Sequence, residues 1–114
     1  MASGTGFSLQ LINTWKDVAT VAIGSIATVW TPASGKKVRL VGGSISVSAA
    51  GNVLFEDNSA GASNFVFRTP KLLADTPYNF DLGGGKVLSS ADNVLKATLS
   101  TTGNLTGTLY GTEE

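Results

Sequence analysis

Apolar and polar residues alternate along this chain in short runs, with a period of two residues. Residues 7–12, for example, place Phe7, Leu9 and Leu11 on one side of an extended chain and polar residues on the other. Alternation of this kind is typical of a β-strand with one buried face. Glycine, which occurs 14 times, destabilises helices and supplies the positive φ angles that β-turns need. The pattern therefore predicts an all-β chain.

The runs of Val, Ile, Leu, Phe and Thr are separated by turn residues, and each run predicts one strand. The triple glycine at 83–85 is expected to form a loop between two strands, and residues 101–103 suit a tight hairpin. The expected strands are residues 7–12, 17–23, 26–31, 36–48, 53–57, 64–68, 77–82, 86–89, 94–100 and 104–110.

The alternation changes phase within the longest expected strand. Val38 and Leu40 occupy even positions, whereas Ile45 and Val47 occupy odd ones. A β-bulge inserts one residue and produces such a change, and Gly42-Gly43 lies where the change occurs. We therefore expect a bulge at this glycine pair. A strand buried on both faces at one end is the alternative.

The number of strands favours two packed sheets. From residue 26 onward, spacing alone gives about eight strands in roughly 85 residues. Eight antiparallel strands in two sheets is the number found in a jelly roll, and an immunoglobulin-like sandwich is the alternative. We predict an eight-stranded antiparallel β-sandwich of jelly-roll type at residues 25–114. Residues 1–24 are expected to form an extended N-terminal arm or an added β-hairpin.

The low charge of the chain suggests that much of its surface is covered. Charged residues make up 14% of the 114 residues, against roughly 25% in an average soluble domain. Eight basic residues balance eight acidic ones, so the formal net charge is zero. A small domain with little surface charge tends to associate. Proteins that bind nucleic acid normally carry a basic excess, so we expect protein partners instead.

Neither a membrane segment nor a secretory signal is expected. The most apolar stretch, residues 18–30, is short and interrupted by Thr20, Gly24 and Ser25, whereas a membrane-spanning helix needs about 20 predominantly apolar residues. The first ten residues have neither the basic start nor the long apolar run of a signal peptide. A membrane is therefore not among the expected partners.

The residue types that carry most enzyme chemistry are absent. The chain has no histidine and no cysteine, which removes the usual general base, the commonest metal ligand and any thiolate. A serine nucleophile would therefore lack a histidine base. We expect no enzymatic activity, and hence no catalytic residue, bound cofactor or metal.

Two short motifs resemble ligand sites but depart from the required pattern. Gly83-Gly84-Gly85-Lys86 is followed by Val87 instead of the Ser or Thr of a phosphate-binding loop, and a strand is expected after it instead of a helix. The stretch Glu56-Asp57-Asn58 lacks the alternating acidic residues of a calcium-binding loop. Both are better interpreted as parts of the β framework, the second as the end of a strand leading into a turn.

Four apolar residues near the N-terminus are candidates for contacts with another protein. Phe7, Leu9 and Leu11 could add a strand to the open sheet edge of a neighbour. Trp15 stands among polar residues outside any clear strand, and tryptophan is enriched at the energetic centres of interfaces. Trp15 could equally close the end of its own sandwich.

Three features together have the character of a known class of proteins. They are the stretch KKVRLVGGSISVSAAGNVLFEDN, the segment Thr-Pro-Tyr-Asn-Phe-Asp, and a last strand that ends Gly-Thr-Leu-Tyr-Gly-Thr-Glu-Glu. Over residues 36–114 the chain resembles small β-sandwich structural proteins of tailed bacteriophages, in particular jelly-roll capsid decoration (cement) proteins. Residues 1–24 have no matching counterpart.

The resemblance implies a structural role in the virion. It implies a homotrimer, or another symmetric oligomer, that binds the outer capsid surface and stabilises contacts between capsomers. The implied partners are the major capsid protein and copies of the chain itself. The implied location is the capsid surface, after synthesis in the host cytoplasm.

Three other functions remain open. A trimeric tail-tip or fibre module that binds a host receptor or glycan would share the fold, and Trp15 and Trp30 exposed side by side would favour it. A self-assembling single jelly-roll shell protein would need loops long enough to tile a shell. A small enzyme is the third, and the missing histidine and cysteine weigh against it.

Overall fold

The structure, a computed structural model, describes residues 12–23, 26–59 and 62–114. These residues form eight strands in two four-stranded sheets. Among the described residues no helix is long and apolar enough to span a membrane. The strands are β1 (Thr14–Ile23), β2 (Ile26–Trp30), β3 (Val38–Val47), β4 (Val53–Ser59), β5 (Ala62–Arg68), β6 (Tyr78–Val87), β7 (Val94–Leu99) and β8 (Gly103–Glu113).

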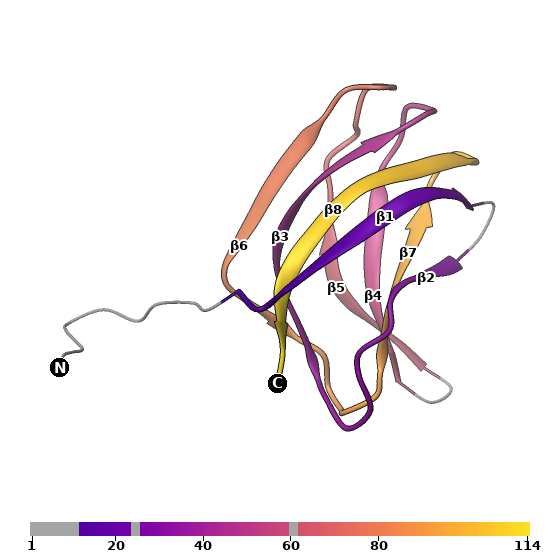
Figure 1. The fold of residues 1–114 in the computed structure, drawn as a ribbon. Coiled ribbons are helices and arrows are strands. Elements are labelled where there is room, and N and C mark those ends of the chain that lie inside the picture. Colours follow the sequence, from indigo (N-terminus) through magenta and orange to yellow (C-terminus); the bar gives the residue numbers. More distant parts are fainter. Residues whose placement is uncertain (1–11, 24–25, 60–61) are drawn as a thin grey trace, which may run out of the picture.

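The two sheets are antiparallel and face each other (Figure 1). One has the strand order β1-β8-β3-β6 and the other β2-β7-β4-β5. The pairs β1–β8, β2–β7, β3–β6 and β4–β5 are therefore all neighbours. This is the arrangement that results when one long antiparallel hairpin of four strand pairs is rolled up. The β3–β8 and β4–β7 pairings then complete the two sheets.

The alternation predicted from the sequence decides which side chains enter the core. In β7, for example, Leu95, Ala97 and Leu99 are buried while the residues between them are partly exposed. Burying one such side chain stabilises the fold by about 1.5–3 kcal/mol. The buried core residues come from both sheets and the loops between them: Val18, Trp30, Val38, Leu40, Ile45, Val47, Val53, Phe55, Val66, Leu72, Phe80, Leu88, Leu95, Ala97, Leu99, Leu105 and Leu109.

Phenylalanine rings join the two sheets along one side of the sandwich. Phe55 and Phe67 belong to β4 and β5, and Phe80 belongs to β6 in the opposite sheet. Their ring centroids lie 5.0 Å apart for Phe67 and Phe80, and 5.8 Å apart for Phe55 and Phe80. Such separations suit favourable aromatic packing.

The expected bulge in β3 is confirmed, one residue before the glycine pair. The register of β3 shifts between Leu40 and Gly42 against both β8 and β6. Val41 is the inserted residue against β8, whereas residues 82–85 of β6 lie opposite Val41. On the β8 side, Leu40 pairs with Gly111 and Gly42 with Tyr110, which are adjacent residues. The insertion explains how the buried positions change from even to odd along one continuous strand.

Residues 83–85 do not form the expected loop between two strands. They lie within β6, which runs without interruption from Tyr78 to Val87. Gly83 and Gly85 have φ angles of 67° and 88°, a region that glycine adopts without a steric penalty. The strand therefore continues through an irregular segment opposite the β3 bulge.

The boundary expected at residue 24 does not separate an arm from the sandwich among the described residues. Residues 14–23 form β1, an edge strand that pairs along its length with β8. Among the β1 side chains that the structure describes, Val18 enters the core. Residues 14–17 contain one apolar residue, Trp15, which explains why the sequence pattern did not extend the strand to residue 14. The eight strands thus begin at residue 14 and not at residue 26. Residues 1–11, and with them the expected strand 7–12, lie outside the described residues.

Candidate interaction surface

Four residues form a row across the outer face of the sheet β1-β8-β3-β6. Trp15 pairs with Tyr110, Tyr110 pairs with Gly42, and Gly42 pairs with Asp81. Tyr110 follows the buried Leu109 and Asp81 follows the buried Phe80, so both side chains point outward, and Trp15 is itself exposed. We call Trp15, Tyr110, Gly42 and Asp81 the aromatic row.

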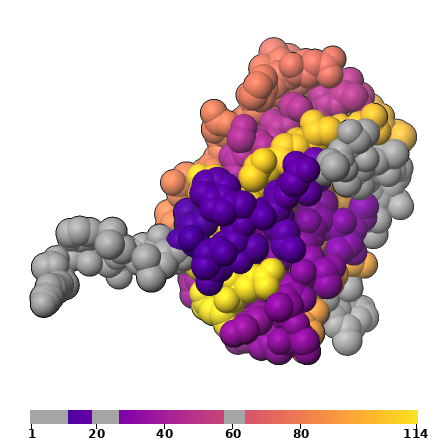
Figure 2. Space-filling view, in the orientation of Figure 1, coloured from indigo at the N-terminus to yellow at the C-terminus, as the bar shows by residue number. Residues whose placement is uncertain are grey.

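The two rings of the aromatic row contact each other. The centroids of Trp15 and Tyr110 lie 5.0 Å apart with an interplanar angle of 41°, and Trp15 is 65% exposed. A side chain at Gly42 would come within 2.6 Å of the Tyr110 hydroxyl oxygen. Tyr110 therefore extends from β8 across the bare backbone of β3. Figure 2 shows β1 and β8, indigo and yellow, side by side on this face of the molecule.

A second row of hydrogen-bonding side chains runs beside the first. Asp17 pairs with Thr108, Thr108 with Ser44, and Ser44 with Asn79. Asp17, Ser44 and Asn79 are exposed and Thr108 is partly exposed. We call these four residues the polar row. Together the two rows present two carboxylates, one amide, hydroxyl groups and two aromatic rings, and no cation.

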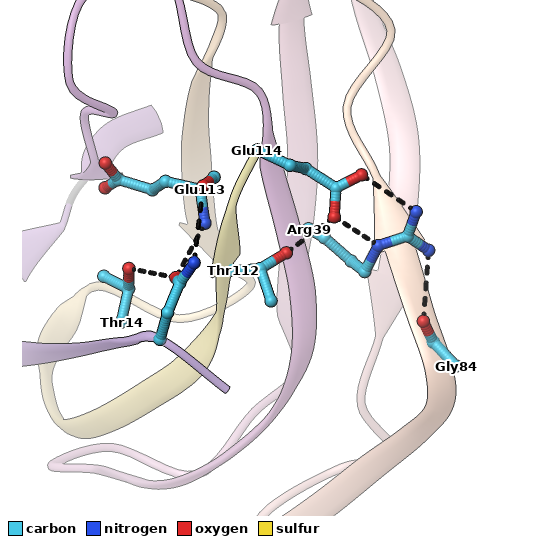
Figure 3. A network of polar contacts seen from close by, with 7 residues as sticks. Thr14, Arg39, Gly84, Thr112, Glu113 and Glu114 are labelled. Carbon is cyan, nitrogen blue, oxygen red and sulfur yellow. Dashed lines mark hydrogen bonds and ion pairs between the residues drawn. The ribbon is translucent and has the colours of Figure 1, made fainter. Parts of the chain in front are cut away.

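The end of β8 is held by a polar network at the edge of this face (Figure 3). Arg39 donates from Nε and Nη2 to the Glu114 carboxylate at 2.9 and 3.0 Å, and from Nη1 to the Gly84 carbonyl at 3.1 Å. The Thr112 hydroxyl donates to Glu114 at 2.7 Å. The hydrogen bond from Arg39, followed by that from Thr112, lowers the pKa of Glu114 to about 2. Each of the three nitrogens of the Arg39 guanidinium thus donates a hydrogen bond within the protein.

Glu113, on β8, links its own sheet to strand β2 of the other sheet. Its carboxylate accepts hydrogen bonds from Trp30 Nε1 of β2 at 2.8 Å and from the Ala33 backbone N–H at 2.9 Å. Burial by itself would raise the pKa of Glu113, but these two hydrogen bonds and nearby lysines bring the pKa below its usual value. The Glu113 backbone N–H donates to Asn13 Oδ1 at 3.0 Å, which fixes the start of β1.

The outer face of the other sheet has a small pocket. It has a volume of about 260 Å³ and is lined by Asn52, Leu54, Arg68, Thr98 and Ser100. The Ser100 hydroxyl accepts a hydrogen bond from the Asn52 backbone N–H at 2.8 Å, so it has a structural role. The lining offers one guanidinium but no carboxylate, and hence no paired acid and base.

Asp57 of the Glu56-Asp57-Asn58 stretch is a structural carboxylate. It is 4% exposed, and its two oxygens accept hydrogen bonds from the Ser89 backbone N–H at 2.7 Å and from Asn93 Nδ2 at 3.0 Å. The carboxylate therefore fastens the loop between β6 and β7 to β4. Within the residues that the structure describes, no group of three or more acidic side chains is placed to hold a metal ion.

One serine–lysine pair has the spacing Ser-x-x-Lys, at Ser34 and Lys37. Residues three apart face each other on a helix, but these two belong to the exposed turn between β2 and β3. The backbone of Lys37 pairs instead with that of Glu114. The helical geometry that would place this lysine beside the serine is therefore missing.

The structure describes one of the four residues predicted for protein contacts. Phe7, Leu9 and Leu11 lie outside the described residues. Trp15 is exposed in β1, so it does not close the end of its own sandwich. Trp30 is 1% exposed, so the two tryptophans are not exposed side by side as expected for a receptor or glycan module. A role of Trp15 in contacting a protein stays a prediction.

The sequence pattern did not predict which residues share a row with Trp15. Tyr110 and Asp81 lie about 95 and 66 residues away along the chain, and only the register of the strands brings them into one row. The alternation of Leu105 and Leu109 in the last strand does indicate that Tyr110 points outward. The sequence pattern contains no comparable signal for the register.

The chain matches no protein-family model, and no curated protein of significantly similar sequence is found. What can be inferred about function therefore rests on the geometry described above.

Proposed function

We propose that this protein is a non-enzymatic structural module of a tailed-bacteriophage particle, a decoration protein that binds the outer capsid surface and stabilises contacts between capsomers. The observation that carries the proposal is the exposure of large apolar side chains at sheet edges. Phe65 on β5 and Val87 on β6 are 65% and 45% exposed, and Leu73, before β6, is 69% exposed. Both strands are edge strands.

Exposed apolar residues at sheet edges indicate neighbours. Monomeric β-proteins usually protect their edges with charges, proline or bulges, because an open edge pairs with other chains. Here two edges present Phe65 and Val87, on a chain with a net charge of zero. Burial of these side chains between copies of the chain, in a homotrimer, or against the major capsid protein removes this liability.

The fold supports the proposal at the level of architecture. We propose that the fold is a jelly roll, and the proposal is supported by the pairing of the first strand with the last, of the second with the seventh, and so on inward. Jelly rolls are frequent among viral capsid domains and lectins. In an immunoglobulin-like sandwich the first and second strands share a sheet, whereas β1 and β2 belong to different sheets here.

The proposal also assigns a role to residues 1–11. Phe7, Leu9 and Leu11 add a strand to the edge of a neighbouring subunit, through backbone hydrogen bonds and alternate side chains. Several such modest contacts per oligomer make the whole assembly bind tightly, since each contact raises the effective concentration of the next.

The proposal predicts where the protein lies and how many copies associate. Cryo-electron microscopy of the parent particle is expected to show this fold on the outer capsid surface. Native mass spectrometry of the purified protein is expected to show a trimer. Density for the fold inside the tail alone, or its absence from the particle, contradicts the proposal.

Two substitutions test directly whether the exposed apolar side chains make these contacts. Phe65→Ser combined with Val87→Ser is expected to shift the oligomer toward monomer and to weaken capsid binding, because both apolar contacts are lost. Thr101→Ser, an exposed turn substitution, is the matched control and is expected to behave like the unaltered protein. Unchanged assembly and capsid binding in the double variant would remove the basis of the proposal.

A further inference from the structure

We propose that the outer face of the sheet β1-β8-β3-β6 is a binding site for a neutral oligosaccharide. The sugar rings lie along the aromatic row, on Trp15 and Tyr110. Their hydroxyl groups exchange hydrogen bonds with Asp81 and with the polar row. This activity goes beyond the structural role proposed above and does not depend on it.

The aromatic row supplies the apolar half of such a site. A pyranose ring has a face of C–H bonds, and the electron-rich face of an aromatic ring attracts the positive edge of such bonds. Trp15 exposes 65% of its surface on an open sheet, and its contact with Tyr110 limits the motion of both rings. Gly42 contributes by the absence of a side chain, since Tyr110 occupies the space above it.

Asp81 and the polar row supply the hydrogen-bonding groups of such a site. Asp81 is exposed, and its Oδ1 accepts a hydrogen bond of 2.7 Å from the Gly83 backbone N–H, which orients the carboxylate. Carboxylates, amides and hydroxyls such as those of Asp17, Asn79 and Ser44 can accept and donate to vicinal sugar hydroxyls. The two chemistries therefore lie side by side on one face.

The dimensions of the two rows favour a short oligosaccharide over a single sugar. Neighbouring strands lie about 4.8 Å apart, so a row across four strands is about 14 Å long. The rows are two residues apart along each strand, which is about 6.7 Å. Sugar rings that stack on the aromatic row thus bring their hydroxyl groups toward the polar row.

The negative charge of the two rows favours a neutral ligand over an acidic one. The two rows contain Asp17 and Asp81 and no cation, so a phosphate, an acidic sugar or a nucleic acid would be repelled. Arg39, on the same strand as Gly42, is already paired with Glu114. The charge of the face is therefore compatible with a neutral ligand.

The composition of the face also argues against a protein partner. The centres of protein interfaces are depleted in aspartate and serine, yet Asp17, Ser44 and Asp81 belong to the same sheet face as the two rings. A second copy packed face to face would bring these carboxylates together, and like charges across an interface are costly. A ligand rich in hydroxyl groups instead satisfies them.

The experiment uses the purified full-length protein and a microarray of neutral oligosaccharides, with sialylated and uronic-acid glycans printed beside them. Binding to a set of neutral glycans alone is the expected result. A titration followed by tryptophan fluorescence with the strongest neutral glycan then gives the affinity, because Trp15 is exposed whereas Trp30 is buried.

Variants assign the binding to this face. Trp15→Ala is expected to weaken binding by at least about tenfold, and Asp81→Ala by a similar factor. Thr101→Ser is the control, because Thr101 is exposed in the turn between β7 and β8, outside both rows and outside the apolar residues of the proposed assembly contacts, and it is expected to leave glycan affinity unchanged. Unfolding curves are measured for every variant, so that a loss of folding is recognised.

Two outcomes overturn the inference. One is no binding to any neutral glycan at millimolar concentration, and the other is binding that Trp15→Ala leaves unchanged. The first outcome can be accompanied by a loss of oligomer or capsid binding in the Trp15→Ala protein. That combination identifies the face as a protein contact, and it leaves the proposed structural function standing.

Discussion

Gly42 shows how the absence of one side chain shapes the candidate binding face. A Cβ atom at this position would lie 2.5 Å from the Phe80 carbonyl oxygen and 2.6 Å from the Tyr110 hydroxyl oxygen. The tyrosine could rotate away, but the carbonyl belongs to the paired strand β6 and cannot. A single methyl group is therefore in conflict both with the sheet and with the aromatic row.

Gly42→Ala is accordingly expected to lower the free energy of unfolding by about 1–3 kcal/mol, the usual cost of overpacking. Denaturant unfolding followed by circular dichroism measures this change. Gly84→Ala is the control, because nothing lies within 4 Å of the added atom and its φ is not positive. Equal stability of the two variants would contradict the close packing of Tyr110 over β3.

Glu114 gives the fold a dependence on acid. Its pKa is about 2 in the folded protein, against an ordinary value of 4.5, chiefly because of the hydrogen bond from Arg39. A carboxyl whose pKa is lowered by folding stabilises the native state above its unfolded pKa, and this contribution is lost as the pH falls toward its folded pKa. The window is therefore between about pH 5 and pH 2.

Glu114→Gln is expected to reduce stability at pH 7 and to flatten the loss of stability between about pH 5 and pH 2. Thermal unfolding at a series of pH values measures both effects. The two proteins are expected to converge at the acid end, where Glu114 of the unaltered protein is protonated and is as uncharged as the glutamine of the variant. Parallel profiles over this range would show that the Arg39 pair does not affect folding.

At the scale of the elements, sequence and structure differ most at β6 and β1. The sequence predicts two strands, 77–82 and 86–89, where the structure has β6 alone, and β1 begins at Thr14 instead of at residue 17. β1 contributes Val18 to the core and displays Trp15 and Asp17 to solvent. Residues 14–17 contain one apolar residue, Trp15, so their place in the sheet comes from backbone pairing with β8, which no side-chain pattern records.

Two truncations separate β1 from the residues before it. Removing residues 1–11 is expected to leave a folded protein with cooperative unfolding, because β1 starts at Thr14. Removing residues 1–23 is expected to unfold or severely destabilise the chain, because β8 then loses one of its two partner strands and the core loses Val18. Circular dichroism and amide NMR spectra measure both outcomes.

A native spectrum after removal of residues 1–23 would mean that β1 is dispensable, as an added arm would be. Loss of structure after removal of residues 1–11 would mean that these residues take part in the core. Either result would move the boundary of the domain.

At the scale of the whole molecule, the sequence predicts the class of fold but not the neighbours within each sheet. Alternation and turn residues are local properties, so an all-β chain, most of its strands and a bulge near Gly42 can be expected from them. The pairing of Trp15 with Tyr110, or of Gly42 with Asp81, depends on how distant strands align. The candidate binding face consists of such pairs, and it is therefore visible only in three dimensions.

The pairing of the first strand with the last also has a consequence for biosynthesis. β8 lies between β1 and β3, so neither strand has its central partner until residues 103–113 have left the ribosome. During translation the nascent chain carries unpaired apolar strands, and neighbouring nascent chains could exchange them. This sheet is thus completed late in synthesis. Chaperones that protect the unpaired strands are therefore needed before β8 has emerged.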